Sequence, residues 1–147
     1  MKRIKYPFVL ILTAIILSNC HQKSAVNHPK NDINKIVVKW VDFDMETVIR
    51  IECDQFENSF GGGYFKTSIS SEKEISNMIN MIKVLKRMDN AYQPDVRGKM
   101  WLYHSNNTID TICFSNIVLR FKNQSYETPP QLIKFLVEKS NRQPKNE

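Results

Sequence analysis

The chain begins with a short apolar segment, and this segment decides how much of the sequence is left to form a folded domain. Lys2, Arg3 and Lys5 precede an apolar run over residues 8–17 that only Thr13 interrupts. The run is too short to span a membrane as a helix, which takes about 20 apolar residues. A basic start followed by about 7–15 apolar residues is typical of a secretory signal peptide. Residues 21–147 then remain, which is enough for one domain.

The apolar run ends in Leu17-Ser18-Asn19-Cys20, which resembles the processing site of a bacterial lipoprotein. The resemblance covers residues 1–20 and implies that residues 1–19 are a signal peptide. It also implies that Cys20 becomes the first residue of the mature protein, with diacylglycerol and a palmitate-type acyl chain that hold it on a membrane. Because His21 and not Asp follows Cys20, the resemblance implies the outer membrane, facing the periplasm. An uncleaved anchor helix and a cleaved signal with an unmodified Cys20 are the alternatives.

The net charge of the mature chain argues against nucleic acid as a partner. The whole sequence has a formal net charge of +6. Three positive charges belong to the expected signal peptide, which leaves +3 for the mature chain, and this is too little to indicate nucleic-acid binding. The polar composition of residues 20–35 predicts the lipidated cysteine and a flexible tether. We expect a single domain over residues 36–140 and a polar tail over residues 141–147.

Two cysteines remain for the domain once Cys20 carries the lipid. Cys53 and Cys113 make an even number in an oxidising compartment, which indicates a possible disulfide. Such a bond would close a loop of about 60 residues and stabilise the fold by about 4 kcal/mol in the chain-entropy model. The alternative is a pair of separate buried thiols, because free cysteine is a common core residue.

The strand signals are β-branched or alternating segments separated by turn residues. Residues 47–53 alternate strictly, so that Ile49, Ile51 and Cys53 would face the core. Asn-rich turns separate three later segments, which indicates an antiparallel meander. The predicted strands cover residues 36–41, 47–53, 64–70, 99–104, 108–114 and 117–122.

Two segments have the periodicity of amphipathic helices. Ser71 and Glu74 form a capping box before a helix that we expect to reach about Met88, with an apolar stripe from Ile75 onward. A second helix is expected after Thr128, which would cap it. The order of these elements predicts an α+β fold with a single curved antiparallel sheet and two helices packed on one face.

A nucleophile–base set is the first chemistry to consider. Cys113, His104 and Asp110 lie on neighbouring predicted strands. However, Cys113 is inside a strand between two apolar residues, whereas catalytic thiols need an exposed and electropositive setting. We expect a hydrogen-bonded structural role for His104, and we expect no catalytic residues, so the protein is not predicted to be an enzyme.

Acidic and polar clusters do not indicate a metal or cofactor site. Asp42, Asp44 and Glu46 lack the spacing of an EF-hand loop and are expected to form a solvated turn. Asp95 and Arg97 are expected to form a salt bridge within a loop. We predict no metal and no cofactor.

The best candidate for a binding surface is a pair of aromatic residues. Trp101 and Tyr103 alternate with Met100 and Leu102, so they face the opposite side of the sheet. If the helices cover Met100 and Leu102, the two rings lie on an open face. We therefore expect a membrane-anchored binding or inhibitory module with a periplasmic protein or peptide partner. The alternatives are a small periplasmic enzyme that uses His104 or Cys113, and a structural envelope lipoprotein.

Overall fold

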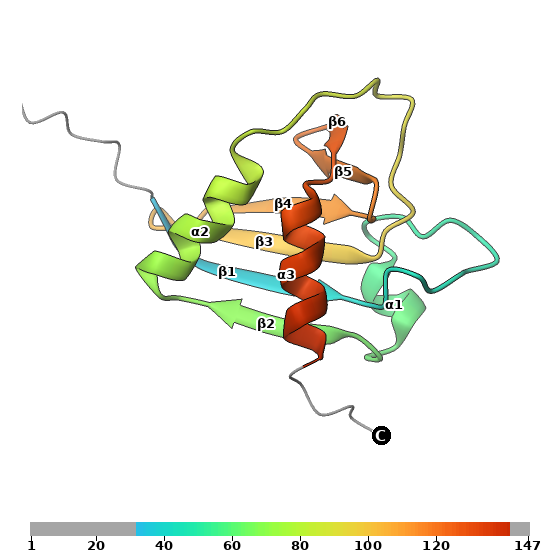
Figure 1. Ribbon diagram of the computed structural model, residues 1–147, viewed down its shortest axis with the longest axis horizontal. Coiled ribbons are helices and arrows are strands. Elements are labelled where there is room, and N and C mark those ends of the chain that lie inside the picture. The colour runs from blue at the N-terminus through green and yellow to red at the C-terminus, as the bar shows by residue number, and fades with distance from the viewer. Residues whose placement is uncertain (1–31, 142–147) are drawn as a thin grey trace, which may run out of the picture. The chain divides into compact units, whose positions relative to one another are not determined.

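The domain is built on one antiparallel sheet of six strands, in the order β2-β1-β3-β4-β5-β6 (Figure 1). The computed structural model describes residues 32–141, so the expected signal peptide, Cys20, most of the tether and the polar tail lie outside the described residues. In the described part, no helix is long and apolar enough to cross a membrane. The elements in chain order are β1 (Ile33–Trp40), α1 (Phe56–Phe60), β2 (Phe65–Ile69), α2 (Glu72–Ile82), β3 (Gly98–His104), β4 (Ile109–Phe114), β5 (Val118–Phe121), β6 (Gln124–Glu127) and α3 (Pro130–Ser140).

One face of the sheet carries the main hydrophobic core, and α2 and α3 lie over it (Figure 1). Alternate residues of each strand supply this face, because successive side chains point to opposite sides of a sheet. Met100 is fully buried here, as are Leu132 and Leu136 from α3, while Ile75 and Met78 come from α2. The predicted fold class, with two helices on one face of a single antiparallel sheet, is confirmed.

The meander after residue 98 agrees with the sequence pattern, and the structure adds a strand. β3, β4 and β5 match the three predicted segments. Lys122 and Asn123 then adopt positive φ angles of 47° and 63° in a tight turn that leads into β6, which we did not predict. At the other end of the domain, β1 begins at Ile33, three residues before the predicted strand.

The predicted long helix ends early, at Ile82 instead of about Met88. The reason is that the following backbone pairs with β6. The Met88 N–H donates to the Ser125 carbonyl at 2.9 Å, and the Glu127 N–H donates to the Lys86 carbonyl at 2.8 Å. Sheet-edge hydrogen bonds therefore override helix propensity in this segment.

Both predicted side-chain caps are wrong, although the helices begin close to the expected positions. Ser71 is the N-cap of α2 but makes no capping hydrogen bond through its side chain. Pro129 and not Thr128 is the N-cap of α3, and the buried Thr128 hydroxyl has no hydrogen-bond partner among the described residues.

The predicted strand over residues 47–53 is also wrong, because this segment is irregular and α1 follows it. The backbone of Ile51 in this segment bonds to residues 95 and 96 instead of joining a strand ladder. The Ile51 N–H donates to the Asp95 carboxylate at 2.8 Å, and the Ile51 carbonyl accepts from the Val96 N–H at 3.0 Å. Ile51 is buried as expected, but Ile49 is 68% exposed.

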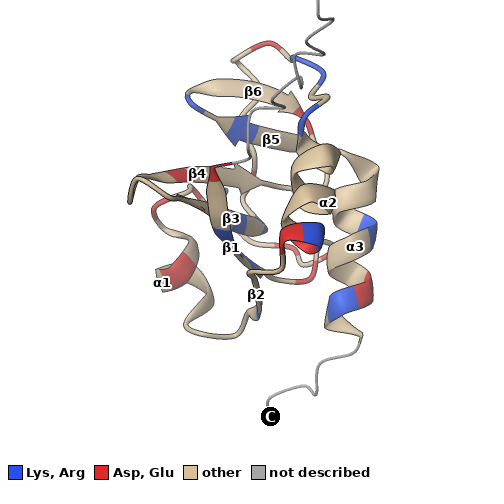
Figure 2. Cartoon of the chain, turned by 90° about the vertical axis from the view of Figure 1, so that its left-hand side faces the viewer, with Lys and Arg blue, Asp and Glu red and all other residues tan. Residues whose placement is uncertain are grey.

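The irregular segment and α1 pack against the second face of the sheet, on the side opposite α2 and α3 (Figure 2). Val41, Phe56, Val96 and Cys113 form a small buried cluster there. The sequence had led us to expect that the second face is open. The irregular segment and α1 instead cover part of it. We call it the disulfide face and define it by Lys39, Lys99, Trp101, Cys113 and Arg120, together with their neighbours on the same side of the sheet.

Candidate functional site

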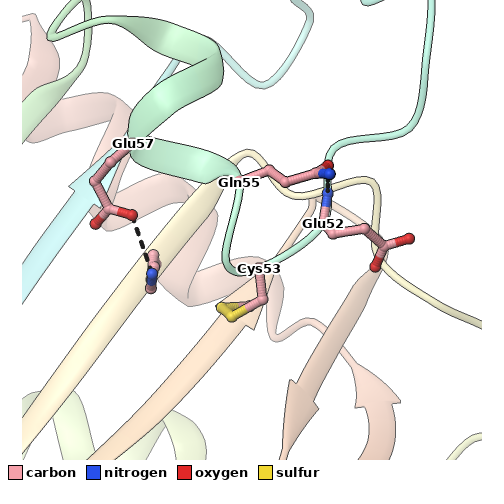
Figure 3. The surroundings of a disulfide bond; sticks show 6 residues. Glu52, Cys53, Gln55 and Glu57 are labelled. Carbon is pink, nitrogen blue, oxygen red and sulfur yellow. Dashed lines mark hydrogen bonds and ion pairs between the residues drawn. A yellow bond between two sulfur atoms is a disulfide. The ribbon is translucent and has the colours of Figure 1, made fainter.

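A disulfide between Cys53 and Cys113 ties the irregular segment to the sheet (Figure 3). The two Cα atoms are 5.7 Å apart, inside the range that a disulfide requires. The bond joins two cysteines that are 60 residues apart in the sequence, and it fixes residues 52–54 over β4. The possible disulfide is thus present, and it leaves Cys113 without a free thiol.

The second anchor of the irregular segment is an ion pair between the buried Arg97 and the partly exposed Asp95. Arg97 is 5% exposed, and its guanidinium donates two hydrogen bonds to the Asp95 carboxylate, at 2.8 and 2.7 Å. The same guanidinium donates to the Met45 carbonyl and to the Thr47 hydroxyl, both at 2.9 Å. The expected salt bridge within the loop is confirmed, and it also holds residues 45–47.

A row of basic residues crosses the disulfide face. Lys39 is directly opposite Lys66 on one side and Lys99 on the other. Lys99 is opposite Cys113, which in turn is opposite Arg120. Neighbouring strands are about 4.8 Å apart, so these like charges are close enough to repel one another. We call Lys66, Lys39, Lys99 and Arg120 the basic row.

Glu57 in the first turn of α1 offsets part of this repulsion. Its carboxylate lies 3.0 Å from the Lys99 ammonium and 3.5 Å from the Lys39 ammonium. Figure 3 shows Glu57 with one of these interactions as a dashed line. Burial tends to raise the pKa of Glu57, but the hydrogen bond and positive charge of Lys99, with the charge of Lys39, outweigh it and lower the pKa. Burial likewise tends to lower the pKa of Lys39, but Tyr64 and Glu57 raise it overall. Both groups are therefore held in their charged forms.

Aromatic rings are interleaved with the basic row. The Trp101 ring has the Lys39 ammonium 5.4 Å and the Lys99 ammonium 5.2 Å from its centroid. The Lys35 ammonium lies 5.4 Å from the Tyr103 centroid. These distances are in the range of cation–π attraction. Trp101 and Tyr103 are half-buried on one face, opposite Met100 and Leu102, as the alternation predicted.

A cleft of about 580 Å³ lies between the disulfide segment and the sheet. This volume is in the range of small-molecule and peptide side-chain sites. Trp101, Thr111 and Arg120 line it from the sheet, while Cys53 and Pro94 line it from the loops. The cleft therefore combines an aromatic ring with charged groups, next to a covalent anchor.

Two further clefts of similar size carry weaker evidence for binding. One, of about 650 Å³, lies beside α2 and the start of α3, and its Lys86 is already paired with Glu127 at 2.6 Å. The other, of about 690 Å³, lies beside α3 and is charged only through Asp42 and Asp44 on an exposed turn. We therefore take the cleft on the disulfide face as the candidate site.

His104 is held by two carboxylates at the far end of β3. Its Nδ1 is 2.9 Å from Asp32, and its Nε2 is 3.2 Å from Asp110. Cys113 is not part of this group. Its partner on β3 is Lys99, five residues from His104 and hence about 17 Å along the strand. The structure does not bring the candidate nucleophile and base together.

Another large aromatic residue and the acidic turn lie outside the cleft. Trp40 is 1% exposed in the core on the helix-covered face, away from Trp101. The Asp42–Glu46 segment is an exposed turn in which the Asp44 N–H donates to the Asp42 carboxylate at 3.0 Å. Within residues 32–141, no group of three or more acidic, histidine or cysteine side chains is arranged to hold a metal ion.

Sequence reasoning missed Arg120 and Asp54, which line the cleft, and Glu57, which pairs with Lys99. Arg120 alternates within β5 and could have been assigned to this face once the order of the strands was known. Glu57 and Asp54 depend on α1 and on the path of the irregular segment, which no local pattern indicates. No protein-family model, curated protein or solved structure matches this chain.

Proposed function

We propose that the protein is a lipid-anchored binding module of the cell envelope, whose cleft on the disulfide face recognises a protein or peptide partner. The observation that carries this proposal is the juxtaposition of Trp101 and Arg120 in a cleft whose walls are fixed by a disulfide and by ion pairs. Preorganised walls favour binding because little conformational entropy is lost when a ligand enters.

The envelope location rests on two independent observations. The first twenty residues resemble a lipoprotein signal, with Cys20 as the lipidated residue. The domain also contains a disulfide, which is typical of proteins outside the reducing cytoplasm. We place the protein on the outer membrane facing the periplasm. Labelling of cells with a radioactive fatty acid tests the anchor: the label should enter the wild type and be lost in Cys20→Ser.

The binding role is tested by in-cell crosslinking and affinity capture of the full-length lipidated protein. We expect one reproducible partner that is lost when Trp101→Ala, in the cleft, is combined with Tyr103→Ala, on the same face of the sheet beside the cleft. The matched control combines Val84→Ala and Val137→Ala, which remove exposed apolar side chains outside the cleft and should leave capture unchanged. Equal capture by the wild type and both double variants would refute the proposal.

The enzyme alternative is less well supported. A thiol mechanism would need Cys113 in the reduced state, and His104 lies on another part of the sheet. A purely structural role does not account for the unpaired charged side chains that line the cleft.

A further inference from the structure

The charged side chains that line the cleft are not all paired. Five of them contribute to its wall: Glu52, Asp54, Lys99, Arg120 and Lys122. Glu52 pairs with Arg50, Lys99 with Glu57 at 3.0 Å, and Lys122 with Asp110 at 3.1 Å. Arg120 and Asp54 remain, and neither side chain forms a hydrogen bond or ion pair with any residue in the described part of the chain.

The two unpaired groups have opposite charges and come from different walls of the cleft. Arg120 is half-buried on β5 and points to the disulfide face, because it is the cross-strand partner of Cys113. Asp54 follows Cys53 in the segment that the disulfide holds over the same strand. The bond therefore keeps a guanidinium and a carboxylate in one cleft, although they do not pair with each other.

Trp101 lies in the same cleft and is half-buried. Its ring offers an apolar surface beside the two charges. A guanidinium binds a carboxylate through two parallel hydrogen bonds, and a carboxylate binds an ammonium group as an ion pair. A ligand that satisfies all three groups has a carboxylate, a cationic group and an apolar group close together.

We infer that the cleft binds a peptide segment that carries an acidic, a basic and an apolar or aromatic side chain close together. Arg120 takes the carboxylate, Asp54 takes the cationic group, and Trp101 packs against the apolar residue. This inference rests on the proposed binding function and names the ligand class for the same cleft. A free amino acid offers the same combination of charges and is distinguished by the experiment.

The experiment is calorimetric titration of the full-length lipidated protein in detergent micelles with four probes. Three are acetylated tripeptide amides: Glu-Phe-Lys, Gln-Phe-Lys, which lacks the carboxylate, and Glu-Phe-Gln, which lacks the ammonium group. The fourth is free phenylalanine. We expect Glu-Phe-Lys to bind about tenfold more tightly than either singly charged peptide, since each lost charged contact costs about that factor.

Substitutions at Arg120 and Asp54 test which of these two residues binds which charge of the peptide. Arg120→Gln should lower the affinity for Glu-Phe-Lys about tenfold and leave that for Gln-Phe-Lys unchanged. Asp54→Asn should lower the affinity for Glu-Phe-Lys by a similar factor and leave that for Glu-Phe-Gln unchanged. Arg87→Gln removes the same charge from an exposed residue outside the cleft and is the matched control. Circular dichroism melting of each variant checks that the fold is kept.

Each outcome has a definite meaning. Three peptides of equal affinity, no binding at millimolar concentration, or tighter binding of free phenylalanine than of any peptide would overturn the inference. If the inference fails while the Trp101 and Tyr103 double variant still loses its partner in cells, the binding function stands and only the ligand class is wrong. If capture in cells is also unaffected, the proposed function itself fails.

Discussion

The two faces of the sheet are built from different interactions, although the same strands supply both. The helix-covered face is a continuous apolar core, in which Met100 on β3 is fully buried under α2 and α3. On the disulfide face the next residue, Trp101, is half-buried among lysines, and a disulfide and two sets of ion pairs hold the covering segment. The first face is stabilised mainly by the burial of apolar side chains, whereas the second depends on particular partners that are far apart in the sequence.

The largest expected effect follows from removing the covalent anchor of the disulfide face. Combining Cys53→Ala with Cys113→Ala should lower the free energy of unfolding by about 4 kcal/mol, because a loop of about 60 residues is released in the unfolded chain. Urea denaturation measures the loss. Hydrogen exchange should rise at residues 51–57 more than in β1 and β3. An unchanged denaturation midpoint would show that the ion pairs alone hold this face.

Met100 and Tyr103 lie on the same strand but face opposite sides of the sheet, so that substitutions at the two positions compare the two faces directly. Met100→Ala should cost about 3 kcal/mol, because it leaves a cavity in a closed core. Tyr103→Ala should cost less than about 1 kcal/mol, because the ring is only half-buried. Thermal or urea unfolding of the two variants tests this, and equal losses would contradict the difference between the faces.

The buried guanidinium of Arg97 is expected to have an intermediate effect. Arg97→Met should lower the free energy of unfolding by about 2 kcal/mol, since it leaves the Asp95 carboxylate without its partner. The full cost of breaking a buried pair is not expected, because the Asp95 side chain is 41% exposed. Hydrogen exchange at residues 45–51 should increase, whereas Arg50→Met, which removes an exposed pair, should leave those residues unchanged.

The smallest effect concerns Glu57 and depends on pH. Glu57→Gln should cost about 1 kcal/mol near neutral pH, since it exposes Lys39 and Lys99 to their mutual repulsion. The folded state lowers the pKa of Glu57 below its ordinary value of 4.5, so its contribution is fully present above that value. The contribution is lost as the pH falls through the lower folded pKa. Urea titrations at several pH values should therefore converge for the wild type and the variant in acid, and a constant difference would contradict this assignment.

The sequence allowed much of the helix-covered face to be predicted. The apolar stripe that begins at Ile75, and the alternation of Met100 and Leu102 with Trp101 and Tyr103, each have a local period that identifies a buried side. The pairing of Cys53 with Cys113 could be raised as a possibility from their number and from the expected compartment, but sequence alone does not measure the distance between them.

The disulfide face could be predicted only in part, because its partners are distant in sequence. Residues 47–53 alternate like a strand, yet Asp95 binds the Ile51 backbone and Arg97 binds the Thr47 hydroxyl, 44 and 50 residues away. The alternation of Ile49 and Ile51 was therefore misleading. Helix α1 has only five residues and no strong period, so the position of Glu57 between two lysines had no local signal.

The most direct test of the central claim is site-specific photocrosslinking in living cells, followed by intact-mass analysis. A photoreactive amino acid replaces either Thr111, which is exposed in the cleft, or Lys134, which is exposed on α3. Our account predicts a discrete adduct from position 111, lost when Trp101→Ala is added, and no such adduct from position 134. Adducts of equal yield from both positions, or from position 134 alone, would contradict the claim that the disulfide face is the binding surface.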